Sequence, residues 1–391
     1  MKYLGIFCLL FTFSQVFAQN VSKVPPHSAV FLLIAPDSRS GAMGDAGVAI
    51  SSDANAAFWN PAKLAFTDKQ FSFSLSHSPW LQNLVPDMTL SYLSAYRRMT
   101  KRIVAGASLR YFNLGSLQVT NNVGQTLQNF GPREFAFDVN LSIQLSTNFS
   151  MGVAGRFMQS NLSGNINNGQ TGINGSSPAN ALCADLSAYY HKDIFIANIK
   201  TKLAFGANIS NIGTKIVYTT LNNADFLPTN FKIGTALTFD IDEYNKFTFA
   251  LDANKLLVPS PPTYSNNGQI VAGTDPKTVG ALNAMASSFY DAPGGFKEEI
   301  SEINYCTGIE YWYKELFALR SGYFYEAPDK GNRQYFTLGI GLRYNTFGID
   351  FSYLVPQTNN TPLANTLRFS LMFNFEKKKK SDKTEETPAN N

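Results

Sequence analysis

Residues able to do acid–base or nucleophilic chemistry are few and scattered in this 391-residue chain. Its only histidines are His27, His77 and His191, and no Gly-x-Ser-x-Gly sequence places a serine on a strand–helix turn. An activated nucleophile needs a base within hydrogen-bond reach, and nothing in the spacing supplies one. Each histidine is expected to be solvated or structural. We predict no catalytic residue and a protein that is not an enzyme.

The sequence also offers few residues suited to metal binding or redox chemistry. The histidines and cysteines do not cluster with metal-ligand spacing, so neither a metal site nor a cofactor is predicted. Cys8 lies in the apolar N-terminal run, which leaves Cys183 and Cys306 in the remainder. They could pair in an oxidising compartment, but small side chains facing the interior are the preferred interpretation. Lys+Arg number 32 against 28 Asp+Glu, which leaves no nucleic-acid footprint.

Two short N-terminal motifs have spacings that suggest a structural role. The stretch from Gly41 to Gly47 resembles a phosphate-cradling loop, but it fits neither the P-loop nor the dinucleotide spacing. Gly41 and Gly44 are therefore expected to let the backbone pack closely against another surface. Asn60 and Pro61 follow residues 49–59, and this region reads as a short helix or turn that closes the periplasmic end of the fold.

The elements that position these residues follow from composition. Lys2, the apolar run from Leu4 to Phe13 and the small Ala18 predict a signal peptide over residues 1–18. Charged residues make up 15% of the chain and aromatics 14%, whereas a soluble domain carries about 25% charged residues. No later stretch approaches the roughly 18 consecutive apolar residues of a membrane helix. This composition predicts an all-β fold, a closed transmembrane β-barrel.

An alternation of apolar and polar residues predicts the antiparallel wall of that barrel. Residues 134–146 show it most clearly, because Phe135, Phe137 and Val139 alternate with polar residues such as Asp138. One face of such a strand suits lipid and the other a wet lumen, where Lys and Arg are tolerated. Fourteen strands are predicted, near residues 70–78, 88–97, 102–112, 134–146, 148–160, 181–190, 199–210, 230–239, 246–254, 303–313, 315–325, 334–344, 347–355 and 366–375.

The connections between these strands predict the orientation. Those after even strands are short, such as 345–346, and those after odd strands are long, such as 113–133. Short turns are periplasmic in bacterial barrels, so the Gram-negative outer membrane is predicted, with both termini periplasmic. The predicted organisation is a periplasmic, plug-like segment over residues 19–68, a barrel over 69–376 and a polar periplasmic tail over 377–391. A soluble β-sandwich or propeller remains the structural alternative.

The longest connection, residues 256–302, is predicted to be extracellular and functional. Val279, Leu282, Met285 and Phe289 recur at helical spacing. An apolar helix face indicates order, with the loop folded either into the barrel mouth or onto a partner. Phe289 and Phe296 have the character of interface anchors.

Three segments resemble the PorV proteins of the Bacteroidetes. They are Ala35–Asp45 with Asn60-Pro61-Ala62, Ser210–Gly213 with Phe226–Pro228, and Ser288–Phe296. The resemblance implies a FadL-like barrel of the type IX secretion system. It would bind the translocon barrel and the C-terminal signal domains of cargo, and pass cargo to an attachment complex that includes a sortase-like protease and uses lipopolysaccharide. By this analogy, the partner- and cargo-binding residues are Phe289, Tyr290, Asp291, Pro293, Gly294, Gly295 and Phe296.

Two other functions stay open. A FadL-like channel for hydrophobic solutes would need an apolar pocket, whereas the predicted inward faces are mostly Ser, Asn, Gln, Gly and charged residues. A lipid A or lipopolysaccharide deacylase would need an activated nucleophile, for which His77 is a candidate base.

Overall fold

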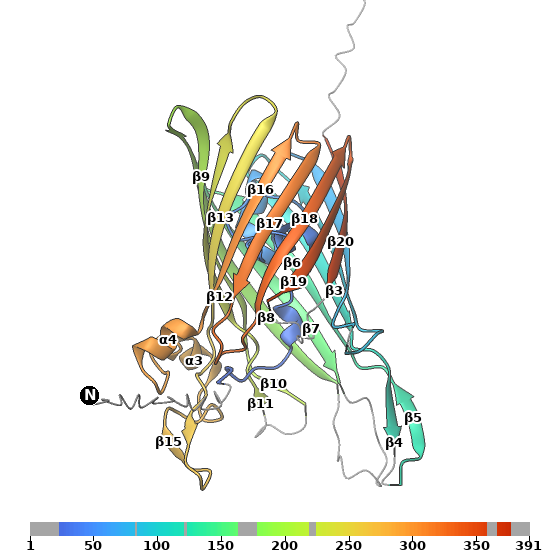
Figure 1. Cartoon of the computed structure of the whole chain (residues 1–391), viewed down its shortest axis with the longest axis vertical. Coiled ribbons are helices and arrows are strands. Elements are labelled where there is room, and N and C mark those ends of the chain that lie inside the picture. Colours follow the sequence, from blue (N-terminus) through green and yellow to red (C-terminus); the bar gives the residue numbers. More distant parts are fainter. Residues whose placement is uncertain are drawn as a thin grey trace, which may run out of the picture.

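The computed structural model describes residues 23–376, apart from 83, 121–122, 163–177, 219–223 and 358–365. These residues form a closed antiparallel barrel (Figure 1). The fourteen predicted wall strands are confirmed, whereas the predicted signal peptide and polar tail lie outside the described residues. The wall runs through β1 (Phe71–Pro79), β2 (Thr89–Arg98), β3 (Ile103–Asn113), β6 (Arg133–Gln144), β7 (Phe149–Asn161), β8 (Ala179–Ile196), β9 (Ile199–Gly213), β12 (Asn230–Asp240), β13 (Asn245–Leu256), β16 (Ile303–Tyr313), β17 (Phe317–Tyr325), β18 (Gln334–Tyr344), β19 (Phe347–Pro356) and β20 (Leu367–Phe375).

The period-two pattern decides which side chains enter the lumen. In β6, Glu134 and Asp138 are buried while Phe137 and Val139 are exposed on the outside. Several cations of the wall strands also face the lumen. The buried ones are Arg110, Arg156, Lys232, Arg320 and Arg368. A lipid-facing exterior and a charged interior follow from this arrangement.

Strand β8 is longer than predicted. The sequence suggested a strand over 181–190 and a connection over Lys192–Asn198, but β8 continues to Ile196 and pairs with β9 throughout that extension. Only Ala197 and Asn198 form the turn, and both have positive φ, 48° and 63°. Such a two-residue turn joins twisted strands tightly. The charged pair Lys192-Asp193 resembled a turn, but it belongs to the hairpin.

The long connections gather at one end of the barrel, at the bottom of Figure 1. They carry two helices, α3 (Ala281–Ser287) and α4 (Phe296–Ser301). They also carry three small hairpins: β4 (Leu117–Thr120) with β5 (Thr126–Phe130), β10 (Ile216–Val217) with β11 (Ala224–Asp225), and β14 (Thr263–Tyr264) with β15 (Ile270–Ala272). No helix in the described ranges is long and apolar enough to cross a membrane.

The N-terminal segment, residues 23–66, threads the lumen and is called the plug below. It contains η1 (Val30–Leu32), α1 (Ser38–Gly41), α2 (Ala56–Trp59) and η2 (Pro61–Phe66). At its far end, η2 packs against β6, β7 and β8 beside the short turns, where closure was expected.

The start of the plug differs from the expectation of a segment held at the periplasmic end. It lies among the long connections, where the Lys23 amide donates to the carbonyl of Asp329 (2.7 Å) and the Ser28 amide to that of Phe226 (2.9 Å). An irregular segment carries no periodicity, so its path could not be predicted.

Candidate functional site

The predicted N-terminal motif is the contact between plug and wall. Gly44 has φ +66°, and a Cβ there would lie 2.5 Å from the Tyr323 amide nitrogen and 2.7 Å from the Thr307 carbonyl oxygen. The Gly44 amide donates to Thr337 Oγ1 (2.8 Å). A Cβ on Gly41 would meet the guanidinium of Arg368. Both glycines therefore allow the plug backbone to lie close to its neighbours.

Asn60 and Pro61 fix the other end of the plug. Asn60 Nδ2 donates to the carbonyls of Val48 (3.1 Å) and Ala188 (3.0 Å), so one side chain ties the plug both to itself and to β8. The Pro61 carbonyl accepts from Ser142 Oγ of β6 (2.5 Å). Pro61 opens η2, where its missing N–H leaves no donor unsatisfied.

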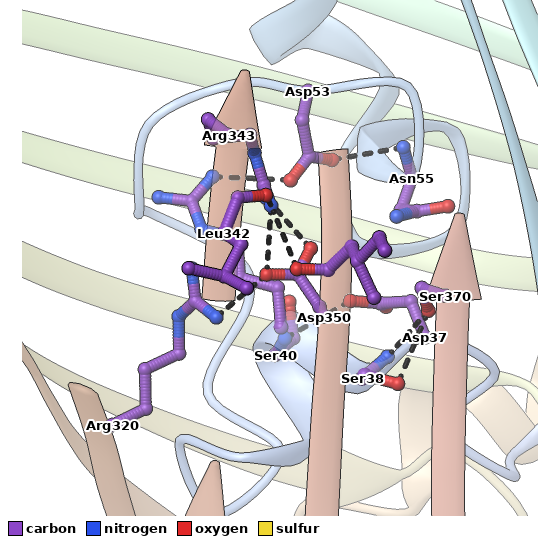
Figure 2. Close-up of polar contacts among 12 residues, drawn as sticks. Asp37, Ser38, Ser40, Asp53, Asn55, Arg320, Leu342, Arg343, Asp350 and Ser370 are labelled. Atoms are coloured by element: carbon purple, nitrogen blue, oxygen red, sulfur yellow. Dashed lines mark hydrogen bonds and ion pairs between the residues drawn. The ribbon is translucent and has the colours of Figure 1, made fainter. Parts of the chain in front are cut away.

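A chain of buried ion pairs joins the plug to the wall at mid-barrel, and Figure 2 shows Asp53 at one end and Asp350 with Arg320 at the other. Arg39 binds Glu310 through both Nε (2.9 Å) and Nη2 (2.8 Å), and Asp53 through Nη1 (3.0 Å). Arg320 continues the chain from Glu310 (2.7 Å) to Asp350 (2.8 Å). Because each charge is paired and hydrogen-bonded, the network tolerates burial, and breaking it would leave a charge unpaired.

Asp37 begins α1 beside this network. Its carboxylate accepts from the Ser40 amide (2.9 Å) and from Trp59 Nε1 (2.6 Å). The carboxylate caps the helix and holds the aromatic end of α2 in place.

The plug leaves little free space beside Leu32, in the part of the lumen toward the long connections. The space between Leu32, Phe58, Arg110, Arg156 and Lys232 has no room for a water molecule. The Lys232 ammonium lies 4.7 Å from the Trp59 ring and 4.9 Å from the Phe58 ring, which stabilises the cation without a carboxylate. The side chains of the plug and the wall therefore pack closely at this point of the lumen.

The histidines and cysteines occupy separate places. His27 Nδ1 contacts the Pro25 carbonyl (2.8 Å), and burial lowers the pKa of His27. His77 contacts Ser91 on the exposed face of β1, and His191 packs edge-on against Phe66 (4.4 Å). The cysteines are both buried and free, and no group of metal ligands occurs among the described residues.

Near its two helices, the long loop exposes the aromatic residues Phe289, Tyr290 and Phe296, which are called the loop surface below. The exposed fractions are 50% for Phe289, 75% for Tyr290 and 79% for Phe296. The Phe289 ring meets that of Phe231 on β12 at 6.4 Å. The loop therefore leans on the wall while Tyr290 and Phe296 remain open, beside the predicted Pro293, Gly294 and Gly295. Asp291 is half-buried, and its carboxylate accepts from the Ser260 amide (3.4 Å).

Three buried glutamates at the end of the loop hold that surface in place, and we call them, with their lysine partners, the ionic clamp. Glu298 binds Lys330 (2.8 Å) and Lys23 (3.2 Å), Glu299 binds Lys255 (3.0 Å), and Glu302 binds Lys255 (2.7 Å) and Lys330 (2.9 Å). The lysines come from the plug, β13 and the β17–β18 connection. One cluster thus fastens four distant segments together.

The clamp also holds the loop backbone. Glu299 Oε1 accepts from the Ala292 amide (2.7 Å), and Glu298 Oε2 accepts from that of Gly294 (2.7 Å). Burial disfavours the charged Glu298, but hydrogen bonds from Lys330 and Gly294 outweigh it and hold its pKa below the ordinary value. No role was predicted for these glutamates, although charge is scarce in the chain and their clustering was a usable signal.

The fold is similar to solved outer-membrane transport barrels. A mutant of the monoaromatic hydrocarbon channel TodX aligns with a TM-score of 0.50 and 13% identity over 87% of this chain and 99% of that one. The toluene transporter TodX of P. putida gives 0.49 and 14%, over 87% and 99%. A Pseudomonas aeruginosa FadL homologue gives 0.47 and 12%, over 91% and 100%. At these identities the likeness concerns the fold alone. No curated protein sequence matches significantly.

Sequence comparison decides the family. The profile of "Type IX secretion system protein PorV" matches residues 17–263, which is more than half of the chain. The chain belongs to the PorV family. Its membership points to a protein of type IX secretion, and a closed antiparallel barrel with an apolar exterior is the fold of outer-membrane proteins.

Two of the segments that carry the PorV resemblance meet in the structure. Asn211 has φ +61° at a register shift between β8 and β9. Its Nδ2 donates to the Pro228 carbonyl (2.9 Å), and its amide donates to Asp185 (2.8 Å). Its Oδ1 accepts from Arg156. In this PorV-family chain, these residues form a bulge at the long-connection rim of the wall.

Proposed function

We propose that this protein is a non-enzymatic outer-membrane subunit of type IX secretion that binds its partners through the loop surface. Those partners are the translocon barrel, the C-terminal signal domains of cargo, and an attachment complex with a sortase-like protease and lipopolysaccharide. The observation that carries the proposal is the exposure of Phe289, Tyr290 and Phe296 on a loop that the ionic clamp holds rigid. Aromatic anchors on a prearranged surface bind without a large ordering cost.

The proposal includes an orientation. Long connections face outward and short turns face the periplasm in barrels of this kind. With this orientation, the start of the plug lies at the cell surface and Glu376 lies on the periplasmic side, where it pairs with Lys69. The plug therefore crosses the whole lumen, which also supports a binding protein over a channel for hydrophobic solutes.

The test is affinity capture of partners from detergent-solubilised outer membranes. The variant is Tyr290→Ala with Phe296→Ala, and the control is Leu117→Ala, which is 51% exposed on the separate β4–β5 hairpin. We expect the double variant to lose the translocon barrel or the cargo domains at least tenfold and the control to keep them. Equal recovery from both folded variants would refute the loop surface as the binding site.

A further inference from the structure

Strand β8 overhangs its neighbour at the short-turn end of the barrel. The last residue of β8 that pairs with β7 is Tyr190, opposite Phe149, whereas β8 ends at Ile196, so six residues of β8 extend beyond that pair. At the equivalent step between β17 and β18, the overhang past Leu342 is two residues, to Tyr344 (344 − 342). The raised hairpin is visible at the upper left of Figure 1.

The extension leaves a backbone edge open. The pairing closes at His191, whose amide donates to the Asn148 carbonyl (2.9 Å) while Asn148 Nδ2 donates to the His191 carbonyl (2.7 Å). Alternate residues of a strand face the same neighbour, so Asp193 and Phe195 present N–H and C=O groups on that edge. Within the described part of the chain, no strand pairs with β8 beyond Tyr190 on this side. The open edge from Lys192 to Ile196 is about 17 Å long.

The side chains beside this edge suit a protein ligand. Phe195 is 76% exposed and Ile196 is 39% exposed, and both lie beyond the point where the pairing with β7 ends. The hairpin carries Lys192, Lys200 and Lys202 against a single acidic residue, Asp193, which lies 3.6 Å from Lys200. Asp240 of β12 lies opposite Lys200, so three positive charges stand beside two negative ones, and the net positive charge favours an acidic ligand. The tight turn keeps the edge extended, so that little ordering cost remains on binding.

We propose that the open edge of β8 binds an extended acidic segment of a periplasmic protein by strand addition. The ligand backbone would pair with Asp193 and Phe195, an apolar side chain would cover the Phe195 ring, and acidic groups would meet the lysines. This inference uses only the orientation from the proposed function and concerns the opposite end of the barrel from the loop surface.

The test is site-specific photo-crosslinking of the full-length protein in its native cell. Phe195 is replaced by benzoylphenylalanine, and the control places the same residue at Tyr244, which is 48% exposed in the β12–β13 turn. Adducts are mapped by mass spectrometry, with and without Asp193→Pro. Proline removes the outward N–H and leaves the hydrogen bonds to β9 intact. Asp193→Ala also removes the carboxylate but keeps the backbone N–H, so it is the matched control for Asp193→Pro.

We expect an adduct from residue 195 that maps to one acidic segment, and little or no adduct from residue 244. The yield from residue 195 should fall at least tenfold with Asp193→Pro and should persist with Asp193→Ala. The proposal is overturned by yields equal to those at residue 244, by an adduct that survives Asp193→Pro in a folded barrel, or by adducts to lipid or to residues 377–391 of the same chain. A variant that loses partner binding at the loop surface should still give the adduct at residue 195. The failure of one proposal can therefore be distinguished from the failure of the other.

Discussion

At the scale of single residues, close backbone packing between plug and wall depends on Gly44. A methyl group at this position would clash with the backbone of Tyr323 and would occupy a left-handed conformation. Overpacking costs about 1–3 kcal/mol and the conformation about 1–2 kcal/mol. We expect Gly44→Ala to lower the temperature at which the barrel loses its folded gel mobility. Gly155→Ala is the control, because a Cβ there meets nothing within 4 Å, and an equal shift in both variants would contradict this reading.

Arg39 is the residue on which the mid-barrel ion pairs depend. Arg39→Met would leave Asp53 without its arginine and Glu310 with Arg320 alone. Removing one partner of a buried pair costs about 3–5 kcal/mol, so we expect the plug to loosen and conductance in planar bilayers to rise. Lys101→Met, at an exposed turn residue, should leave the conductance at the native level. An unchanged current in the Arg39 variant would mean that other contacts suffice to hold the plug.

At the scale of elements, the ionic clamp holds the loop that carries the loop surface in its folded conformation. Glu302→Gln would weaken contacts to Lys255 and Lys330 together and would leave two buried lysines poorly paired. We expect proteolysis within residues 256–302 to accelerate about tenfold or more while the barrel stays folded, since Glu302 lies in the loop and not in the wall. Glu243→Gln, in the exposed β12–β13 turn, is the matched control and should not change the cleavage rate.

The clamp also predicts how the loop responds to pH. The pKa of Glu298 lies below its ordinary value of 4.5, and that of Lys330 lies above its ordinary value of 10.5 because of Glu298 and Glu302. The glutamate contribution is therefore present above pH 4.5 and is lost as the pH falls through the lowered pKa. The lysine contribution is complete below pH 10.5. We expect protease resistance of the loop to be constant through neutral pH and to fall below pH 4.5, and a loss near pH 7 would contradict the assignment.

At the scale of the whole molecule, the path of the plug separates the two chain ends. Lys23 lies among the long connections and Glu376 lies beside β1 at the short turns. We expect an epitope placed directly before Lys23 to bind antibody on intact cells, and one after Asn391 to bind only after the outer membrane is opened. Labelling of the two epitopes under the same condition would refute either the path or the orientation.

The sequence by itself determined the barrel and the direction of its side chains. Alternation in segments such as 134–146 is a local pattern, and the lipid outside and polar lumen act on every strand in the same way. The glycine spacing likewise indicated close packing before any partner was known. The length of β8 was predicted too short, because Lys192 and Asp193 have the composition of a turn and the pairing with β9 overrides it.

Tertiary structure alone decided the path of the plug, the ionic clamp and the open edge of β8. Lys23 and Glu298 are 275 residues apart in sequence, and no periodicity connects them. The same is true of Arg39 and Glu310, at a separation of 271. Such contacts depend on closure of the barrel, which brings distant segments to one place. Local composition specifies which face of a strand is polar, whereas the identity of the buried partner is fixed only when the wall has closed around the plug.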